Sequence, residues 1–509
     1  MIAVKGYLAP VLHAHLPFVR HPEHDEFLEE DWLYQAITGC YVPLLKVCES
    51  LIRDRIPFRL TLVVTPTLAE MLADDLLMSR FRSYLGRRIK LAEREVHRTR
   101  RQPGYNKLAR MYLQRFTKIR ARFTRRYHGN LLAAIKRLHD SGHLALFTSA
   151  ATHAYLPLLM RYPAAIRAQI KTAVRCHRRH FGSRPDGIWL PECGYAPGLD
   201  EILQENRLSQ FVLAAHGVMF ADPRPVFGTC APILCPSGAA AFARDRQSSW
   251  QVWSSEAGYP GDFDYREFYR VKGFDLDYHR ITGGRGRKQL YNPEKAEEKA
   301  RMHACHFISE RERHILALSV ETRGSPPPVL VCPYDAELFG HWWYEGPGFL
   351  DQVLRGTAAN PHLECITLPE YLGRHPVHQV ARPAASSWGQ GGYSYVWLNP
   401  ANDWIYPLLH RATGKMQSLA GKNPRARGLR LRALKQCARE LLLAQSSDWA
   451  FIMHSKTAVE YATRRTKDHL IAFETLSSQI QNGKIDRPTL ESYESRNNLF
   501  PDIDYKDFT

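Results

Sequence analysis

Two acidic residues stand out because each follows an apolar, strand-like run and is flanked by aromatic rings. Glu192 lies in WLPECGY (189–195), and Asp335 lies in CPYDAELFGHWW (332–343). Apolar walls can desolvate and aim a carboxylate, which tunes it for acid–base or nucleophilic work. Two carboxyl groups at strand ends match the needs of glycosidic bond cleavage, an acid and a nucleophile on opposite sides of one bond. Glu192 taken alone would be better explained as a helix cap or a salt-bridge partner.

Two histidines, His13 and His15, close the first apolar run, in the motif HAHLP. Alternate residues of a strand point to the same side, so both imidazoles are predicted to face one way. Such a pair can hydrogen-bond a polar substrate or begin a metal site. A metal-dependent barrel of the polysaccharide deacetylase kind would need an aspartate or a third histidine to converge with them, and no nearby spacing supplies one.

Tryptophans and glycines alternate in a third group, SSWGQGGY (386–393) followed by WLNPANDW (397–404). Glycine lets the backbone pass close to a ligand, and a tryptophan face can cover the apolar face of a sugar ring. Core aromatic residues of a helical domain would look similar. The flanking glycines favour a sugar-binding groove.

Seven short β-rich segments place most of these residues at strand ends. The segments are 7–15, 58–65, 143–148, 187–192, 211–215, 329–334 and 363–368. Helical patterns such as 34–53 and 163–180 separate most of them, which predicts a parallel sheet with helices outside. The carboxyl ends of parallel strands form the active face of α/β folds, so we expect a closed or nearly closed barrel.

The segment 80–126 is strongly basic. It holds 17 lysine and arginine residues against two glutamates, which accounts for most of the net charge of +18. Its apolar spacing predicts two helices broken at 102–104, an inserted hairpin. The charge indicates either a solvated face or a docking surface. Because the excess is local, we expect no nucleic-acid partner.

The other stretches complete the predicted organisation. Residues 217–288 are rich in glycine, proline and aromatics and are expected to form long functional loops. Beyond residue 382 helical spacing returns, and the polar tail 487–509 is expected to be extended or loosely packed. The chain has 509 residues and ten widely spaced cysteines, and the pattern of its first residues does not predict a signal peptide. It also lacks any run of about 18 apolar residues, so we expect a cytoplasmic protein with no membrane partner.

With these motifs in view, the chain resembles glycoside hydrolase family 57 over nearly its whole length. The segments that carry the likeness, in the family's order, are HAHLP, SGHLALFTSAATHAYLPLL, WLPECGY, PYDAELFGHWW, SSWGQGGYSYVWLNPANDWIYPLLHRA and ARELLLAQSSDWAFIM. The resemblance implies a (β/α)7 barrel over 1–380, interrupted by the basic helical insertion at 80–126. It also implies a C-terminal α-helical domain over 381–509 that contributes aromatic residues to a glucan groove.

Within that family the chain resembles the 1,4-α-glucan branching enzymes, which implies roles for particular residues. Glu192 would be the nucleophile and Asp335 the general acid of a retaining transglycosylase that cleaves α-1,4-glucan and transfers the chain to a 6-hydroxyl, forming glycogen branches. The implied substrate-binding residues are His13, His15, His153, Trp32, Trp253, Trp342, Trp388 and Trp397. The implied partner is an α-glucan polymer (amylose, amylopectin or glycogen), and neither a cofactor nor a metal is implied.

Alternatives remain at this stage. A hydrolytic α-glucanase, an amylase of the same family, fits the same catalytic pair. A barrel that has lost activity and acts as a binding protein is an alternative of another class. The family's branching enzymes also place a tyrosine on a mobile loop over the site, and the stretch 223–228 carries Phe227 instead. The transferred chain length and the oligomeric state are open.

Overall fold

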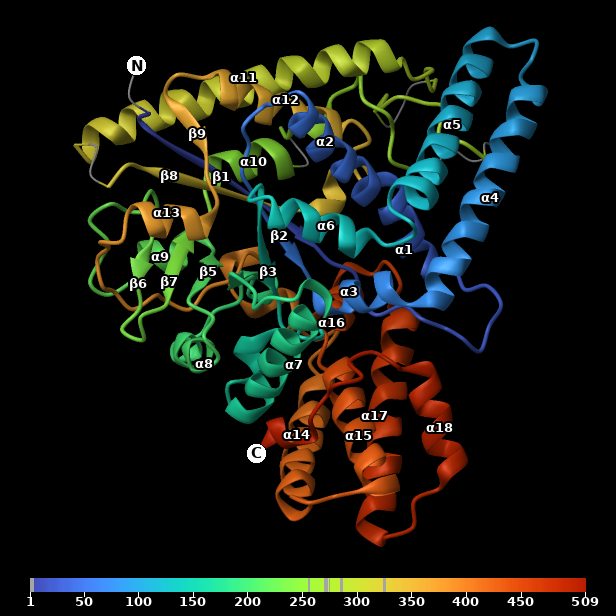
Figure 1. Cartoon of the computed structure of the whole chain (residues 1–509), viewed down its shortest axis with the longest axis vertical. Coiled ribbons are helices and arrows are strands. Elements are labelled where there is room, and N and C mark those ends of the chain that lie inside the picture. Colours follow the sequence, from blue (N-terminus) through green and yellow to red (C-terminus); the bar gives the residue numbers. More distant parts are fainter. Residues whose placement is uncertain (1–3, 255–256, 270–272, 274, 284–286, 324–325) are drawn as a thin grey trace.

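The structure is a computed structural model that describes residues 4–254, 257–269, 273, 275–283, 287–323 and 326–509. Strands and helices alternate up to about residue 374, and the remaining long elements are all helical (Figure 1). In these described ranges, no helix is both long enough and apolar enough to cross a membrane.

Parallel strands curl into a barrel, in the spatial order β7-β5-β4-β3-β2-β1-β8. These strands are β1 (Gly6–Ala14), β2 (Leu60–Val64), β3 (Leu144–Thr148), β4 (Gly187–Ile188), β5 (Gln210–Leu213), β7 (Ala240–Ala243) and β8 (Val329–Asp335). Arg244, directly after β7, forms a parallel bridge with Val331 of β8. This bridge joins the two ends of the sheet, so the predicted (β/α)7 barrel is confirmed.

One barrel strand lies where the sequence predicts a loop. The predicted strand at 363–368 is β9 (Leu363–Cys365), which pairs only with the start of β1 and is not a barrel stave. The missing stave is β7, inside the region predicted as long loops, where it also pairs with β6 (Ile233–Leu234). Its sequence AAFA is mostly alanine, which has weak strand propensity, so no pattern marks it.

The barrel interior is filled by alternate residues of the strands. Tyr7, Ala9 and Val11 of β1 point inward and pack with rings such as Phe147 and Trp189. The other face of the barrel is covered by helices, among them α2 (Val42–Arg53), α7 (Pro163–Phe181), α11 (Pro293–Glu321) and α12 (Gly346–Ala359) (Figure 1). The inward row of β1 continues to His13 and His15, so the strand period itself directs both histidines to the mouth.

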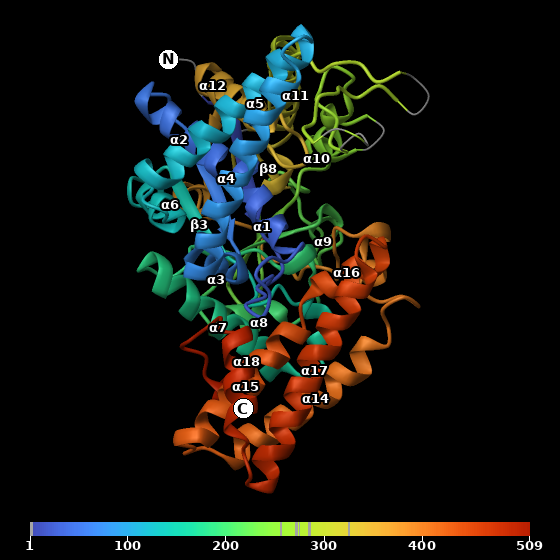
Figure 2. The same cartoon turned by 90° about the vertical axis from the view of Figure 1, so that its right-hand side faces the viewer.

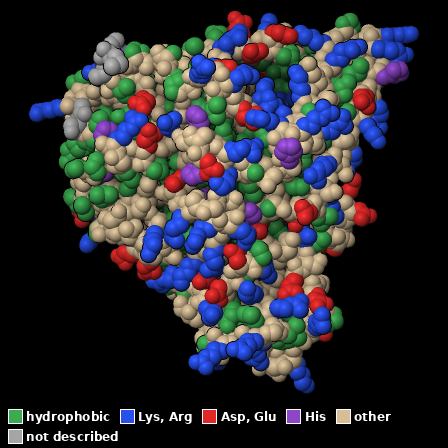
Figure 3. Space-filling model, viewed as in Figure 1, with side chains coloured by type: hydrophobic (Ala, Val, Ile, Leu, Met, Phe, Trp, Pro, Cys, Tyr) green, Lys and Arg blue, Asp and Glu red, His purple; other side chains and the backbone are tan. Residues whose placement is uncertain are grey.

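The basic segment forms the predicted hairpin. Helices α4 (Asp75–Arg98) and α5 (Pro103–Ala121) lie side by side and project from the barrel. The chain reverses between Arg98 and Pro103, close to the predicted break. Lysine and arginine side chains gather over this hairpin at the upper right of Figure 3.

The C-terminal part is a helical lobe on one side of the barrel (Figures 1 and 2). It contains α14 (Ile405–Lys422), α15 (Gly428–Ala444), α16 (Ser447–Ser455), α17 (Val459–Asn482) and α18 (Arg487–Arg496). Figure 1 shows that α16 lies on the side of the lobe that faces the barrel.

The prediction of a loosely packed tail is wrong. Beyond α18 the chain packs against α7, and Tyr505 and Phe508 are each only 1% exposed. Asp507 also pairs with Arg175 of α7. Two aromatic side chains bury enough apolar surface to order an otherwise polar segment.

The turn after β8 requires glycine at position 340. Gly340 has φ +109, and an added Cβ would overlap the carbonyl oxygen of Gly39. We expect Gly340→Ala to lower the free energy of unfolding by about 3 kcal/mol, because the substitution combines backbone strain with a backbone clash. The measurement is thermal or urea-induced unfolding followed by circular dichroism.

Gly348 of α12 is the matched control for this prediction. A Cβ there would meet no atom within 4 Å. Gly348→Ala should be neutral or stabilise the protein by up to about 1 kcal/mol, since alanine favours helix. Equal stabilities of the two variants would contradict the requirement at position 340.

Candidate active site

The carboxyl ends of β1 and β8 bring the first functional pair together. His13 and Asp335 are register partners on these adjacent strands. His13 donates from Nδ1 to Oδ1 of Asp335 over 2.9 Å. The Asp335 side chain is 34% exposed, whereas His13 is buried. One carboxylate oxygen of Asp335 is therefore fixed, and its second oxygen is left for chemistry.

His13 also belongs to a stack of three histidine rings, together with His15 and His153. The ring centroids of His15 and His153 are 3.8 Å apart, and those of His13 and His153 are 5.0 Å apart. His15 donates from Nε2 to Asp448 over 3.0 Å. Burial would lower the pKa of His15, but neighbouring carboxylates, Asp448 first, raise it above its usual value. Burial lowers the pKa values of His13 and His153, so these two imidazoles are neutral at pH 7.

Glu192 lies on the short turn Pro191–Cys193 that follows β4. Its backbone is left-handed, with φ 63, which is rare for glutamate. The indole N–H of Trp388 donates to Oε2 over 2.8 Å, and the hydroxyl of Ser447 donates to Oε1 over 3.1 Å. Burial raises the pKa of Glu192 to about 7, while the Trp388 hydrogen bond acts in the opposite direction. The carboxylate is thus held by both oxygens in a largely desolvated position.

Glu192 and Asp335 belong to one cluster. Nδ1 of His153 lies 3.8 Å from Oε1 of Glu192, and the His153 ring stacks on His13, the partner of Asp335. The charge of Asp335 also contributes to the raised pKa of Glu192, after burial. Two carboxyl groups that are 143 positions apart in the chain are therefore linked through the rings of His153 and His13.

Glu337 is a third carboxyl group in this cluster. It accepts hydrogen bonds from the backbone N–H of His15 and from the hydroxyl of Tyr41. Burial, followed by the charge of Asp335, raises its pKa to about 8. Glu337 is only 6% exposed, so it supports the turn that follows Asp335 rather than facing the open mouth.

Ser447 and Asp448 were not predicted from the sequence. Both lie at the start of α16 and reach the cluster through Glu192, His153 and His15. Their local pattern, Ser-Ser-Asp before an apolar run, is typical of a helix cap. The available signal was the family-like segment that contains SSDW, since the spacing in the chain gives no hint that it meets His15.

Three of these side chains could be considered as metal ligands. Nitrogen atoms of His15 and His153 and a carboxylate oxygen of Asp448 lie within 4.8 Å of one another. However, the two rings stack with an interplanar angle of 19°. Imidazole lone pairs lie in the ring planes, so stacked rings do not aim them at one point as a metal site requires. The arrangement suits hydrogen bonding to a polar ligand better.

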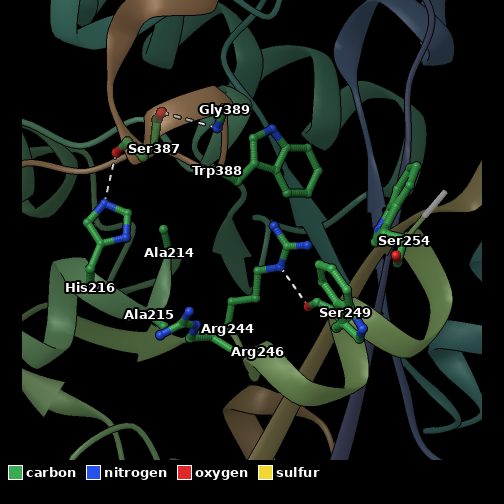
Figure 4. Close-up of a pocket in the computed structure, with 13 residues that line it drawn as sticks. Ala214, Ala215, His216, Arg244, Arg246, Ser249, Ser254, Ser387, Trp388 and Gly389 are labelled. Carbon is green, nitrogen blue, oxygen red and sulfur yellow. Dashed lines mark hydrogen bonds between the residues drawn. The ribbon is translucent and has the colours of Figure 1, made fainter. Parts of the chain in front are cut away.

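A cavity of about 520 Å³ is bordered by Trp388, the residue whose indole N–H donates to Glu192 (Figure 4). Trp388 forms one wall, and Trp250 and Trp253 of α10 (Arg246–Trp253) line the cavity as well. The guanidinium of Arg244 lies over the Trp388 ring, and its Nε donates to Ser249 over 2.7 Å. Partly exposed aromatic rings beside hydrogen-bonding groups are suited to sugar rings.

The other predicted tryptophans have different surroundings. Trp397 is only 1% exposed and stacks on Tyr155 at 4.5 Å, so its faces are not free for a sugar, contrary to the prediction. Trp342 is 52% exposed and stacks on Phe268. Trp32, on α1 (Glu30–Ala36), is partly buried and packs edge-on against Tyr461 of α17. Of these three rings, Trp342 alone has a large exposed surface.

Phe227 is not over the active site. It lines a different cavity, together with Pro232 and Pro326. The neighbouring Cys230 accepts a hydrogen bond from Val329, the first residue of β8, whereas Asp335 is the last residue of that strand. Phe227 therefore lies toward the opposite end of the barrel, and it does not replace a loop tyrosine at the mouth.

The chain matches two protein-family models. Residues 9–383 match the one described as glycosyl hydrolase family 57. Residues 408–508 match the one described as the C-terminal part of 1,4-alpha-glucan branching enzyme. Together these ranges cover the barrel and the helical lobe.

Known relatives cover nearly the whole chain. The 1,4-alpha-glucan branching enzyme of Thermococcus kodakarensis is 36% identical, over 98% of this chain and 78% of that protein. A probable 1,4-alpha-glucan branching enzyme of Mycobacterium tuberculosis is 30% identical over 98% of both chains. These levels of identity over full-length alignments indicate a common fold and a common family.

Solved structures of related proteins also superpose over nearly the whole chain. The alpha-amylase of Thermotoga maritima superposes with a TM-score of 0.92, with 41% identity over 99% of both chains. The family 57 branching enzyme of Pyrococcus horikoshii superposes with a TM-score of 0.91, with 34% identity over 99% of this chain and 97% of that one. With a barrel whose strand ends bear two acidic groups, and with family matches along most of its length, the chain belongs to glycoside hydrolase family 57.

Proposed function

We propose that this protein is a 1,4-α-glucan branching enzyme that works through a covalent glycosyl-enzyme intermediate. The observation that carries the proposal is that Glu192 and Asp335 are linked through His153 and His13, and that Trp388, which donates to Glu192, lines the aromatic cavity. A retaining mechanism needs such a pair flanking one glycosidic bond. Relatives named as branching enzymes, over both the barrel and the helical lobe, support the transfer reaction.

In the first step Glu192 acts as the nucleophile. Its carboxylate forms a bond to the anomeric carbon while the bond from that carbon to the glycosidic oxygen breaks. Asp335 gives its proton to the leaving 4-oxygen, from the oxygen that His13 does not hold. In the neutral rings of His13 and His153, Nε2 has no hydrogen-bond partner among the described residues, which suits it to accept from a sugar hydroxyl group.

In the second step an acceptor chain replaces the leaving chain. Asp335, now ionised, takes the proton from a 6-hydroxyl of the acceptor. That oxygen attacks the anomeric carbon, the ester to Glu192 breaks, and an α-1,6 branch results. An acceptor held in the cavity beside Trp388 and Trp253 has a high effective concentration, which favours transfer over attack by water.

Hydrolysis of α-glucan is the second candidate function. The Thermotoga maritima relative, 41% identical, is named an alpha-amylase. The same two carboxylates serve both reactions, and the outcome depends on whether water or a sugar hydroxyl reaches the intermediate. The aromatic cavity beside Glu192 favours the acceptor sugar.

The proposal extends to the setting of the enzyme. Its substrate is an α-glucan polymer, and its place is glycogen biosynthesis in the cytoplasm. Cysteine usage supports a reducing compartment, since all ten cysteines are free and nine of them are buried. A polymer substrate also suits a wide, open cavity rather than an enclosed pocket.

Substitution of the catalytic pair tests the mechanism. We expect Glu192→Gln to lower turnover of amylose by about three orders of magnitude or more, because the amide cannot form the ester intermediate. Asp335→Asn should lower it strongly on amylose and weakly on substrates with an activated leaving group, which needs no protonation. Retention of most of the activity in Glu192→Gln would remove this residue from the mechanism.

The reaction type is tested with the wild-type enzyme. Amylose is incubated with the enzyme, half of the product is treated with a debranching enzyme, and chain lengths and reducing ends are compared. Branching predicts new short chains after debranching and few new reducing ends before it. New reducing ends without any α-1,6 links would assign the protein as an amylase.

The pH profile should report the ionisation of Glu192. The nucleophile must be a carboxylate, so kcat/KM should fall as the pH drops through about 7, the raised pKa of this group. Trp388→Phe removes a hydrogen bond that lowers this pKa, and the acidic limb should move up by about 0.5–1 pH unit.

Trp253→Phe is the control for this shift. Trp253 lines the same cavity, but no described hydrogen bond joins it to Glu192. It should change KM without moving the acidic limb. A limb that stays in place in Trp388→Phe, or that moves to lower pH, would refute the assignment of this limb to Glu192.

A further inference from the structure

The helical lobe reaches into the barrel mouth at one point, the start of α16. Ser446 forms an antiparallel bridge with Ala154, and the backbone N–H of Ser447 donates to the carbonyl of His153 over 3.0 Å. The side chain of Asp448 accepts from His15. Three consecutive residues, the N-cap Ser446 and the first two residues of α16, are thus bonded to the barrel.

Two of the barrel residues near this contact have a strained backbone. His153 and Glu192 have φ values of 57 and 63, in the left-handed region. Residues with side chains stay in this region only when the surrounding structure holds them. The carbonyl of His153 accepts from Ser447, and that of Glu192 accepts from the N–H of Trp388 over 3.0 Å. Segments C-terminal to the barrel strands therefore hold both strained residues.

The hydroxyl of Ser447 joins the same two residues through their side chains. Nδ1–H of His153 donates to Oγ of Ser447 over 2.9 Å, and Oγ donates to Oε1 of Glu192 over 3.1 Å. The direction of the first bond follows from the second, because Ser447 gives its single hydroxyl proton to Glu192 and can only accept from His153. Ser447 thus supplies one of the two side-chain hydrogen bonds that Glu192 accepts, and Trp388 supplies the other.

We propose that Ser447 is a positioning residue for the nucleophile, so that the docking of α16 against the barrel sets the orientation and the ionisation of Glu192. This inference rests on the proposed role of Glu192 as nucleophile and goes beyond it. It assigns the helical lobe a part in bond cleavage, in addition to any part in holding glucan. The charged and titratable groups near Glu192 include Asp335, Asp448, His15, His153, Tyr155 and Cys193.

The test uses the full-length protein and a p-nitrophenyl α-maltooligoside. Release of p-nitrophenol needs little help from the general acid, so the acidic limb of kcat/KM reports the nucleophile. Ser447→Ala should lower kcat about 10- to 100-fold with little change in KM, and it should move the acidic limb to higher pH, since a hydrogen bond to a carboxylate is lost. Ser447→Thr keeps the hydroxyl and should restore both the wild-type kcat and the wild-type position of the acidic limb.

Ser455→Ala is the matched control. Ser455 lies at the other end of α16, and its hydroxyl donates to the carbonyl of Ile452. It should keep the wild-type rate and pH profile. Thermal melting of all three variants checks that the helix remains docked.

Two results would overturn the proposal. One is a Ser447→Ala enzyme with the wild-type pH profile, whatever its rate. The other is a Ser447→Thr enzyme as impaired as Ser447→Ala although its melting temperature is normal. The outcome is separable from that of the proposed function, because cleavage of this substrate is measured whether the natural reaction is transfer or hydrolysis. If Glu192→Gln cleaves the p-nitrophenyl substrate at the wild-type rate, the role of Glu192 as nucleophile is rejected, independently of the result for Ser447.

Discussion

The active site depends on holding the carboxyl group of Glu192 ionised and in a fixed orientation although it is largely buried. Burial raises the pKa of Glu192, and an ionised carboxylate without partners in such a place would cost several kcal/mol. Trp388 and Ser447 offset this cost with one hydrogen bond to each oxygen. Neither residue belongs to the barrel strands. The end of β4, the segment at 386–388 and the start of α16 must therefore meet, and this requirement explains why the lobe is joined to the barrel at its mouth.

The three stacked histidines near Glu192 differ in their protonation. His13 and His153 are neutral, whereas Asp448 favours the charged form of His15. Two uncharged rings lie along the path from Glu192 to Asp335. Like charges raise the pKa of a neighbouring carboxyl group, and the charge of Asp335 contributes in this way to the raised pKa of Glu192.

The point where the barrel closes is also part of the functional surface. Arg244 completes the sheet through its backbone bridge to Val331, and its side chain lies over Trp388 at the cavity wall. The short strand before it, β7, is held by pairing with β5 rather than by its own propensity. Closure of the barrel therefore positions Arg244 at the border of the cavity. The backbone of this residue helps to close the sheet, and its side chain helps to form the cavity wall.

The strand-end positions of His13, Glu192 and Asp335 can be predicted from the amino-acid sequence, as can the barrel with its helical hairpin and helical lobe. These features are local or periodic, so apolar patterns and family motifs reveal them. Four features emerge only from the folded chain: β7 is a stave, Trp397 is buried, the tail packs on α7, and Ser447 and Asp448 complete the site. These features depend on contacts between residues far apart in the chain. The side chains of Ser447 and Glu192 are 255 positions apart, and no local spacing encodes such a meeting; it follows from the way the helical lobe packs on the barrel.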